Sequence, residues 1–274
     1  MKLQFTNGYR PHFDQVTRIL QYLLANGEQQ KIPRKDIVDK LGIPNRQVEN
    51  LTSMMVGFGL VMPRTTKLTS LGRKIIQSDP YFEKTETLWI VHYNVSSDPD
   101  WVVWHRIVNT VMHAKDEFEV DDVSKQYFSD IEIHYSERTI SEKLPTEIGA
   151  VLAAYMRSDL SKLGLFDTEA SGRFIKTTPK DVPLLAFLYA LIRFRDNHSP
   201  GSSAVNINDI CYEENSPGRV MNIDEYQVRA LLNDLHDFDF IRLEKLANLD
   251  QVRLNDKMTQ EAVTDRIYGD QDEP

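Results

Sequence analysis

The sequence contains one cysteine, Cys211, among 274 residues, which excludes an intramolecular disulfide and any zinc site of the CxxC type. It also lacks a run of about 18 apolar residues, so no membrane-spanning helix is expected. The first residues, MKLQFTNGYRPHF, lack the apolar core of a secretory signal peptide. We therefore expect a cytoplasmic protein that has no contact with a membrane.

Motifs of the common enzyme classes are missing as well. The patterns GxxxxGK, GxGxxG, GxSxG and HExxH do not occur, so nucleotide binding, acyl transfer and zinc proteolysis have no support in the sequence. We expect no cofactor, no metal site and no catalytic residues, and hence a protein that is not an enzyme. A metal-dependent nuclease stays open as a further class, because it would need only carboxylates that converge in space.

Two groups of residues resemble metal ligands. His105 and His113 are eight residues apart, about two helical turns, and with His92 they form a sequence cluster. Because no cysteine or HExxH motif accompanies them, we expect packing or capping roles. The acidic stretch DEFEVDD has no lysine at the spacing typical of nucleases, and we interpret it as a strand leading into a helix capped by Asp121 or Asp122.

Charge is distributed unevenly along the chain. Although the net charge is −9, residues 1–78 contain 12 Lys and Arg against five Asp and Glu, a net charge of +7. The rest of the chain holds 20 basic and 36 acidic residues, a net charge of −16. A basic first segment is typical of a nucleic-acid-binding domain, whereas the acidic remainder suggests a different partner.

Apolar spacing in the basic segment predicts helices within 11–27, with a stop at Gly27, within 31–42, with a stop at Gly42, and within 46–59. A tight turn, IPN, separates the second helix from the third. The stretch LVMPRTTKLT then predicts a short hairpin, after which SLGRKIIQS begins another helix. Two helices joined by a tight turn and followed by a hairpin are the order of a winged helix-turn-helix.

The same order recurs twice. Residues 151–179 and 226–255 each predict a helix followed by a hairpin, so we expect a mainly α protein with short β-hairpins, built from tandem winged helix-turn-helix units joined by a helical connector. The connector contains all three tryptophans in two helices split by SSDPD, and we interpret these tryptophans as core, with a partner groove as the alternative. The predicted domains are a basic first unit (1–78), the connector (79–115), a second unit (116–195), a third unit (196–266) and a disordered acidic tail (267–274).

A pattern around the first hairpin resembles a known family. Leu68–Gly72 reads Leu-Thr-x-Leu-Gly, Asp79–Tyr81 reads Asp-Pro-Tyr, and Thr87–Trp89 reads Thr-Leu-Trp with His92 three residues after the tryptophan. Over roughly residues 55–110 the chain is similar to an uncharacterised bacterial defence-island family, found beside genes for DNA phosphorothioation or for enzymes like phosphoadenylylsulfate reductase. The family's N-terminal Gly-His-Glu-Thr-Phe run is replaced here by FTNGYRPHF. The resemblance implies an accessory role in DNA modification or defence and supplies no catalytic residues.

The third helix is the expected reading helix of the first unit. If Val48, Leu51, Met55 and Phe58 face the core, Arg46, Glu49, Asn50 and Ser53 face outward, although an acidic residue is unexpected there. We expect base contacts from Arg46 and Asn50 and phosphate contacts from the second helix and the hairpin. The predicted DNA-binding residues are Arg34, Lys35, Lys40, Arg46, Asn50, Ser53, Arg64, Lys67, Arg73 and Lys74. An ordinary solvated turn is the alternative for the hairpin.

Taken with charge and resemblance, the sequence predicts a non-enzymatic, DNA-binding accessory subunit of a bacterial DNA-modification or phage-defence system. Double-stranded DNA would bind the first unit. The acidic remainder would bind a partner protein or a second copy of the chain, because the carboxylates of NDLHDFDF in the third unit would repel phosphate, whereas the second unit stays undecided. The alternative is a protein-interaction scaffold in which the winged helices serve only as structural units.

Overall fold

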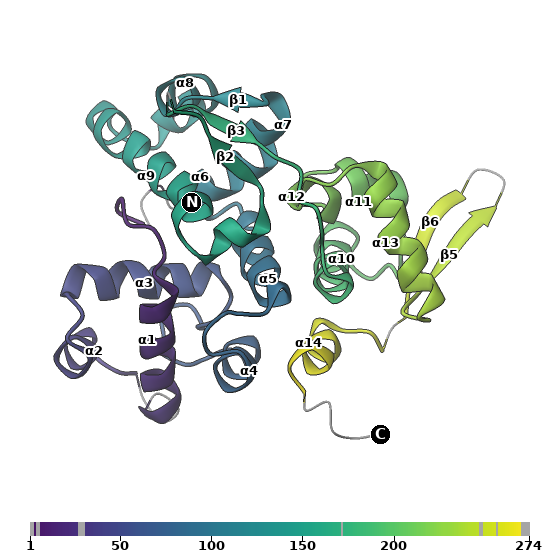
Figure 1. The fold of residues 1–274 in the computed structure, drawn as a ribbon, viewed down its shortest axis with the longest axis horizontal. Coiled ribbons are helices and arrows are strands. Elements are labelled where there is room, and N and C mark those ends of the chain that lie inside the picture. Colours follow the sequence, from purple (N-terminus) through teal and green to yellow (C-terminus); the bar gives the residue numbers. More distant parts are fainter. Residues whose placement is uncertain are drawn as a thin grey trace.

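Helices dominate the structure, a computed structural model that describes residues 3, 6–26, 31–170, 172–246, 249–255 and 257–269. Two small three-stranded antiparallel sheets accompany them (Figure 1), so the predicted class, mainly α with short β-hairpins, is confirmed. Gly27, the predicted stop of the first helix, lies outside the described residues. The helices of the first unit are α1 (Phe13–Asn26), α2 (Arg34–Leu41), α3 (Asn45–Gly57) and α4 (Ser70–Ser78).

The first two helices follow directly from their sequences. The apolar residues of α1 recur every three or four positions, so that one face is buried and the other is solvated. Helix α2 ends at Gly42, which has a φ of 64° and donates its backbone N–H to the carbonyl of Val38. Glycine adopts this left-handed conformation without steric cost, and the chain turns sharply from there into α3.

The connector places an almost fully buried helix at the centre of the molecule. It consists of α5 (Thr85–Ser96), α6 (Val102–Arg106), the π-helical segment η1 (Ile107–Val111) and α7 (Met112–Ala114). Every residue from Thr87 to Ser96 is buried, because α5 contacts α3, α6, α10 and α12 around its circumference (Figure 1). Trp89, Trp101 and Trp104 are all buried, so their interpretation as core is confirmed.

A polar network inside this core joins several elements. Nδ1 of His92 lies 2.6 Å from the hydroxyl of Tyr155, which also accepts a hydrogen bond from Nε1 of Trp104. Nε2 of the same histidine lies 3.0 Å from the carbonyl of Val220. Burial lowers the pKa of His92 to about 4, against which the hydrogen bond to Val220 acts only weakly. His92 is therefore a neutral packing residue near neutral pH, as the sequence suggested.

The second unit contains one of the two sheets. Its elements are β1 (Glu117–Phe118), α8 (Val120–Tyr127), the 3-10 segment η2 (Ser129–Ile133), α9 (Glu137–Arg157), the 3-10 segment η3 (Asp159–Leu163), β2 (Phe166–Thr168) and β3 (Phe174–Lys176). The predicted hairpin is present, and β1 adds a third strand by pairing with β3. The predicted cap of α8 is wrong: Glu119 occupies the capping position, and Asp121 and Asp122 lie within the first turn.

The third unit repeats the arrangement with longer strands. Helix α10 (Leu184–His198) crosses the predicted boundary between the second and third units. The elements that follow it are β4 (Ala204–Asn206), α11 (Ile207–Tyr212), α12 (Pro217–Val220), α13 (Glu225–Asp237), β5 (Ile241–Leu246), β6 (Leu249–Leu254) and α14 (Gln260–Tyr268). The strand order is β4-β6-β5, with Val252 of the central strand opposite Val205 on one side and Leu243 on the other. The hairpin predicted from the sequence is thus the β5–β6 pair.

The last helix returns to the first unit. Lys74 of α4 binds Glu261 at 2.8 Å and Asp265 at 2.6 Å on α14, and the hydroxyl of Tyr268 bonds to that of Thr87. Burial opposes the charge of Lys74, but these two carboxylates prevail and raise its pKa. The tail predicted to start at 267 is corrected by this helix, since residues 267 and 268 are its buried last turn. Residues 270–274 lie outside the described part of the chain.

The units share one hydrophobic core. Buried apolar side chains form a continuous cluster that runs from Leu3 in the first unit to Tyr268 in α14. The division into separate units therefore stays a prediction from the sequence. Among the described residues, no helix combines the length and the apolar character that a membrane span requires.

Candidate nucleic-acid interface

The hairpin after α3 is short and closely held. Val61 and Leu68 form an antiparallel bridge, and the backbone N–H of Thr69 donates to the carbonyl of Leu60. Helix α4 packs so closely behind it that a Cβ on Gly72 would lie 2.1 Å from the carbonyl oxygen of Leu60. Only glycine fits there, which explains the glycine in the Leu-Thr-x-Leu-Gly run.

The tip of this hairpin is a tight turn with an unusual residue. The N–H of Thr65 donates to the carbonyl of Met62, and Arg64 has a φ of 62°. With Pro63 before it, Arg64 occupies the turn position that normally requires glycine or asparagine. Its side chain is exposed. The chain thus has an arginine at the outermost point of the hairpin despite an unfavourable backbone conformation.

A groove of about 750 Å³ lies between α2, α3 and the hairpin, and we call it the α3–hairpin groove. Thr66 helps to shape it by accepting a hydrogen bond from the backbone N–H of Ile32, which fixes the hairpin against the segment before α2. Three cationic side chains, Lys31, Arg34 and Arg64, line it together with Glu49. Its remaining lining residues are Ile32, Pro33, Ile37, Asn45, Thr52, Ser53, Val56, Thr65 and Thr66.

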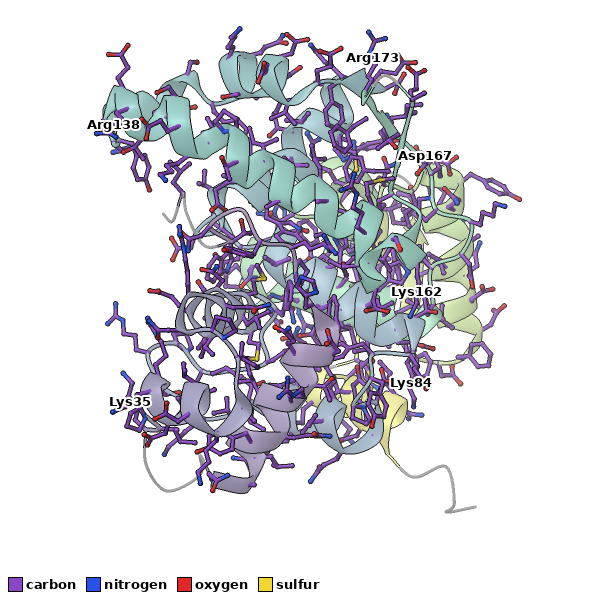
Figure 2. All side chains as sticks on the ribbon, turned by 60° about the vertical axis from the view of Figure 1, so that its left-hand side comes forward. Lys35, Lys84, Arg138, Lys162, Asp167 and Arg173 are labelled. Atoms are coloured by element: carbon purple, nitrogen blue, oxygen red, sulfur yellow. The ribbon has the colours of Figure 1, made fainter. Side chains whose placement is uncertain are left out.

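Most of the predicted DNA-binding residues lie around this groove. Arg34, Ser53 and Arg64 line it directly. Four more predicted residues are exposed on α2, α3 and the hairpin without lining the groove: Lys35, Lys40, Arg46 and Lys67. Figure 2 shows Lys35 projecting from the outer edge of the first unit, away from Arg173 at the other end of the view. The fold therefore brings together cations that are more than 30 positions apart in sequence.

Three predicted residues do not belong to this surface. Asn50 was expected to face outward, but it is only 1% exposed, and its Oδ1 accepts a hydrogen bond from Nδ2 of Asn7. Lys74 was expected to contact DNA, but its side chain is 18% exposed and holds α14. Arg73 is half-buried on α4, outside the set of groove-lining residues.

Sequence reasoning missed several groove residues. The face of α3 that lines the groove consists of Asn45, Glu49, Thr52, Ser53 and Val56. These positions follow the helical period, so the correct face could have been found by burying Met54 as well as Met55. Lys31 and Thr66 come from flanking segments, and no periodic signal in the sequence marks them.

An ion pair lies within the groove. Nη1 of Arg34 lies 3.0 Å from Oε2 of Glu49, and both side chains are about half exposed, at 46% and 50%. The pair joins the first residue of α2 to the middle of α3. Because an exposed ion pair contributes little to stability, its placement on the groove face is of more interest than its strength.

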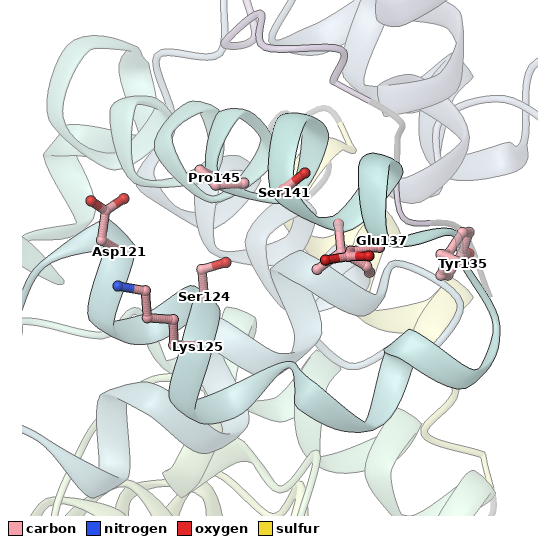
Figure 3. A pocket seen from close by; sticks show the side chains of 8 residues that line it. Asp121, Ser124, Lys125, Tyr135, Glu137, Ser141 and Pro145 are labelled. Carbon is pink, nitrogen blue, oxygen red and sulfur yellow. The ribbon is translucent and has the colours of Figure 1, made fainter.

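A second groove, of about 630 Å³, lies between α8 and α9. Figure 3 shows Asp121, Ser124 and Lys125 on α8 facing Ser141 and Pro145 on α9. Pro145 lacks the N–H that would bond to the carbonyl of Ser141 inside α9. Two carboxylates, Asp121 and Glu137, and a single cation, Lys125, line this groove, so it does not favour a polyanion.

The described part of the chain shows no cluster of side chains suited to bind a metal ion. No group of three or more His, Cys, Asp or Glu side chains is placed there to hold a metal ion. Nε2 of His105 instead lies 2.8 Å from Oδ1 of Asn215 and 3.2 Å from Oε1 of Glu214, and His113 bonds to the carbonyl of Arg219. Burial lowers the pKa of both histidines.

Comparisons with known proteins give a family and a fold. A sequence profile described as "Protein of unknown function (DUF4007)" matches residues 21–268. No curated protein matches the sequence. A crystal structure of magnesium ion-bound SspB is similar in fold, with a TM-score of 0.80 and 16% identity over 96% of this chain and 87% of that one. A second crystal structure of SspB has a TM-score of 0.77 and 15% identity over the same shares.

Proposed function

The chain belongs to the DUF4007 family of proteins of unknown function, and we propose that it is a non-enzymatic, DNA-binding accessory subunit of a bacterial DNA-modification or phage-defence system. The match to this family covers the pattern at residues 68–92 on which the sequence resemblance rests. The likeness to SspB extends over 96% of the chain. From the sequence resemblance we further propose that its partner enzymes act in DNA phosphorothioation or are similar to phosphoadenylylsulfate reductase.

One observation carries the DNA-binding part of the proposal: three exposed cations, Lys31 before α2, Arg34 on α2 and Arg64 on the hairpin, line a single groove that α3 borders. Interpreted as a winged helix-turn-helix, α3 is the reading helix and the hairpin is the wing. In such a unit the helix enters the major groove while cations on the wing and on α2 contact phosphates. The net charge of +7 on residues 1–78 supports the same interpretation.

The third unit suits a protein partner better than DNA. Tyr226 at the start of α13 is 83% exposed, and Tyr212, whose hydroxyl bonds to the neighbouring Glu225, is 52% exposed. Phe238, just after the last residue of α13, is 66% exposed. Aspartates at 234, 237 and 239 share this end of the helix, so DNA phosphates would be repelled. Exposed aromatic side chains are typical of protein interfaces, and we propose that the third unit binds a partner protein or a second copy of the chain.

A protein-interaction scaffold is the second candidate, and one observation favours it. Lys74, counted from sequence among the DNA contacts, joins α4 to α14 through Glu261 and Asp265 instead. Basic residues of the first unit thus also serve to hold the chain together. A scaffold of this kind would not bind DNA in a salt-dependent manner.

Binding of a fluorescent 20-base-pair duplex to the full chain tests the proposal, with a double variant in which Arg64 and Lys67 become Ala. Two exposed cations on α9, Arg138 and Lys143, provide the matched control pair. We expect the hairpin variant to bind more weakly and with a shallower salt dependence, because each phosphate contact contributes about 0.9 to the slope of log K against log salt. Equal binding by both variants would favour the scaffold.

Enzymatic activity is tested separately. We expect no nicking of supercoiled plasmid in the presence of magnesium, which is bound in one of the SspB structures. Reproducible cleavage that a single substitution abolishes would overturn the non-enzymatic part of the proposal and leave DNA binding intact.

A further inference from the structure

Glu49 is the acidic residue on the face of α3 that lines the groove. It stands one helical turn after Asn45 and one turn before Thr52 and Ser53, with a half-exposed carboxylate. Resting on the proposed DNA-binding function, we infer that Glu49 determines specificity by accepting a hydrogen bond from the N4 amino group of a cytosine in the major groove. Arg34 is then a positioning residue that holds the carboxylate.

A carboxylate on a DNA-reading face has to meet a donor. Facing phosphates it is repelled, which weakens binding to every sequence. The major groove offers two amino donors, N4 of cytosine and N6 of adenine. Adenine presents the N7 acceptor beside its amino group, and this lone pair repels the second carboxylate oxygen. Cytosine has no such acceptor at its major-groove edge, so a carboxylate prefers cytosine.

The ion pair explains how the carboxylate stays in place. Arg34 is the first residue of α2, and its Nη1 lies 3.0 Å from Oε2 of Glu49 on the neighbouring helix. Guanidinium is permanently charged and has five N–H donors, so one bond to Glu49 leaves others for the DNA. Fixing one oxygen of Glu49 leaves Oε1 to accept a hydrogen bond from a base.

The experiment is a selection of duplexes with a randomised centre by the full chain at moderate salt, followed by sequencing of the bound fraction. We expect the parent protein to enrich cytosine roughly tenfold or more over thymine at one position. Glu49→Gln should shift the preference at that position from cytosine to adenine, because a glutamine amide pairs with both N6 and N7 of adenine. Glu49→Ala should lose the cytosine preference without gaining adenine.

Asp39→Asn is the matched control. Asp39 is an exposed carboxylate on α2 outside the groove lining, so its substitution removes the same charge without touching the reading face. It should raise affinity slightly for all duplexes and keep the cytosine preference. Arg34→Lys, which retains the charge but loses the planar fork, should weaken the cytosine preference more than the affinity.

Outcomes separate this inference from the function on which it rests. If the parent binds duplexes without enriching cytosine, or if Glu49→Gln keeps the preference of the parent, the role of Glu49 is wrong and DNA binding still stands. If the parent binds no duplex even at low salt, both are wrong. If Arg34→Lys lowers the affinity but keeps the cytosine preference, Arg34 contacts a phosphate and does not position Glu49.

Discussion

Arg64 gives the sharpest prediction for the hairpin, because its effects on folding and on DNA binding should have opposite directions. Its φ of 62° costs a non-glycine residue about 1–2 kcal/mol. Glycine at this position would remove that cost. It would also give the unfolded chain more conformational freedom, which lowers the stability of the folded state by about 0.5–1 kcal/mol. Arg64→Gly should therefore leave the free energy of unfolding unchanged or raise it by up to about 1.5 kcal/mol.

DNA binding by the same variant should weaken. Removing one phosphate contact lowers the slope of log K against log salt by about 0.9. Raising salt from 50 to 200 mM weakens DNA binding by both proteins, and the factor by which binding weakens should be about 3.5 times smaller for the variant than for the parent. Urea unfolding and fluorescence anisotropy measure the two effects, with Arg64→Lys as the control that keeps the charge. If Arg64→Gly binds DNA with the parent's affinity and slope, the turn is only a solvated loop.

Other predictions concern the core, the contact between α4 and α14, and the acidic surface. Lys74→Ala should cost about 1–2 kcal/mol in urea unfolding, because it removes charged hydrogen bonds to Glu261, and should leave the DNA salt slope unchanged; the reverse pattern would return Lys74 to the interface. The pKa of His92 is about 4 when folded and about 6.5 when unfolded, so protons favour the unfolded chain and stability falls as pH drops from 6.5 to 4. His92 alone should lower the unfolding free energy by about 2 kcal/mol between pH 7 and pH 5, and His92→Gln should flatten this dependence. Tyr226→Ser with Phe238→Ser should change stability by less than about 0.5 kcal/mol per site and leave DNA affinity within about twofold, since both side chains are exposed; a tenfold loss of affinity would place DNA on the third unit.

Local patterns in the sequence predicted most of the helices. Apolar spacing located α1 and α3, and Gly42 marked the end of α2. Hairpins of the second and third units were also predicted, because each has two short apolar runs around a polar turn. The pairing of the third strand of each sheet was not predicted, since β1 and β4 pair with strands roughly 45 to 60 residues further along the chain.

The sequence-based prediction of the candidate site was wrong for side chains that are buried by segments distant in the sequence. Asn50 is buried because the segment around Asn7 covers it, and no local pattern reveals that contact. Lys74 has its partners about 190 residues further along, on a helix whose end was assigned to a disordered tail. Glu49 was recognised as unexpected on the outer face of α3, but its ion pair with Arg34 became visible only in the fold.

Hydrogen exchange on the full chain, with and without a 20-base-pair duplex at low salt, tests most directly whether the first unit binds DNA. The account predicts that slowed exchange is confined to the hairpin at residues 60–69 and to the first turns of α2 and α3, where backbone amides are nearest to the groove. Protection of the hairpin amides should disappear as salt is raised, because salt cations compete with the protein for the phosphates. Protection centred on α13 and the β5–β6 hairpin while DNA is bound would contradict the account.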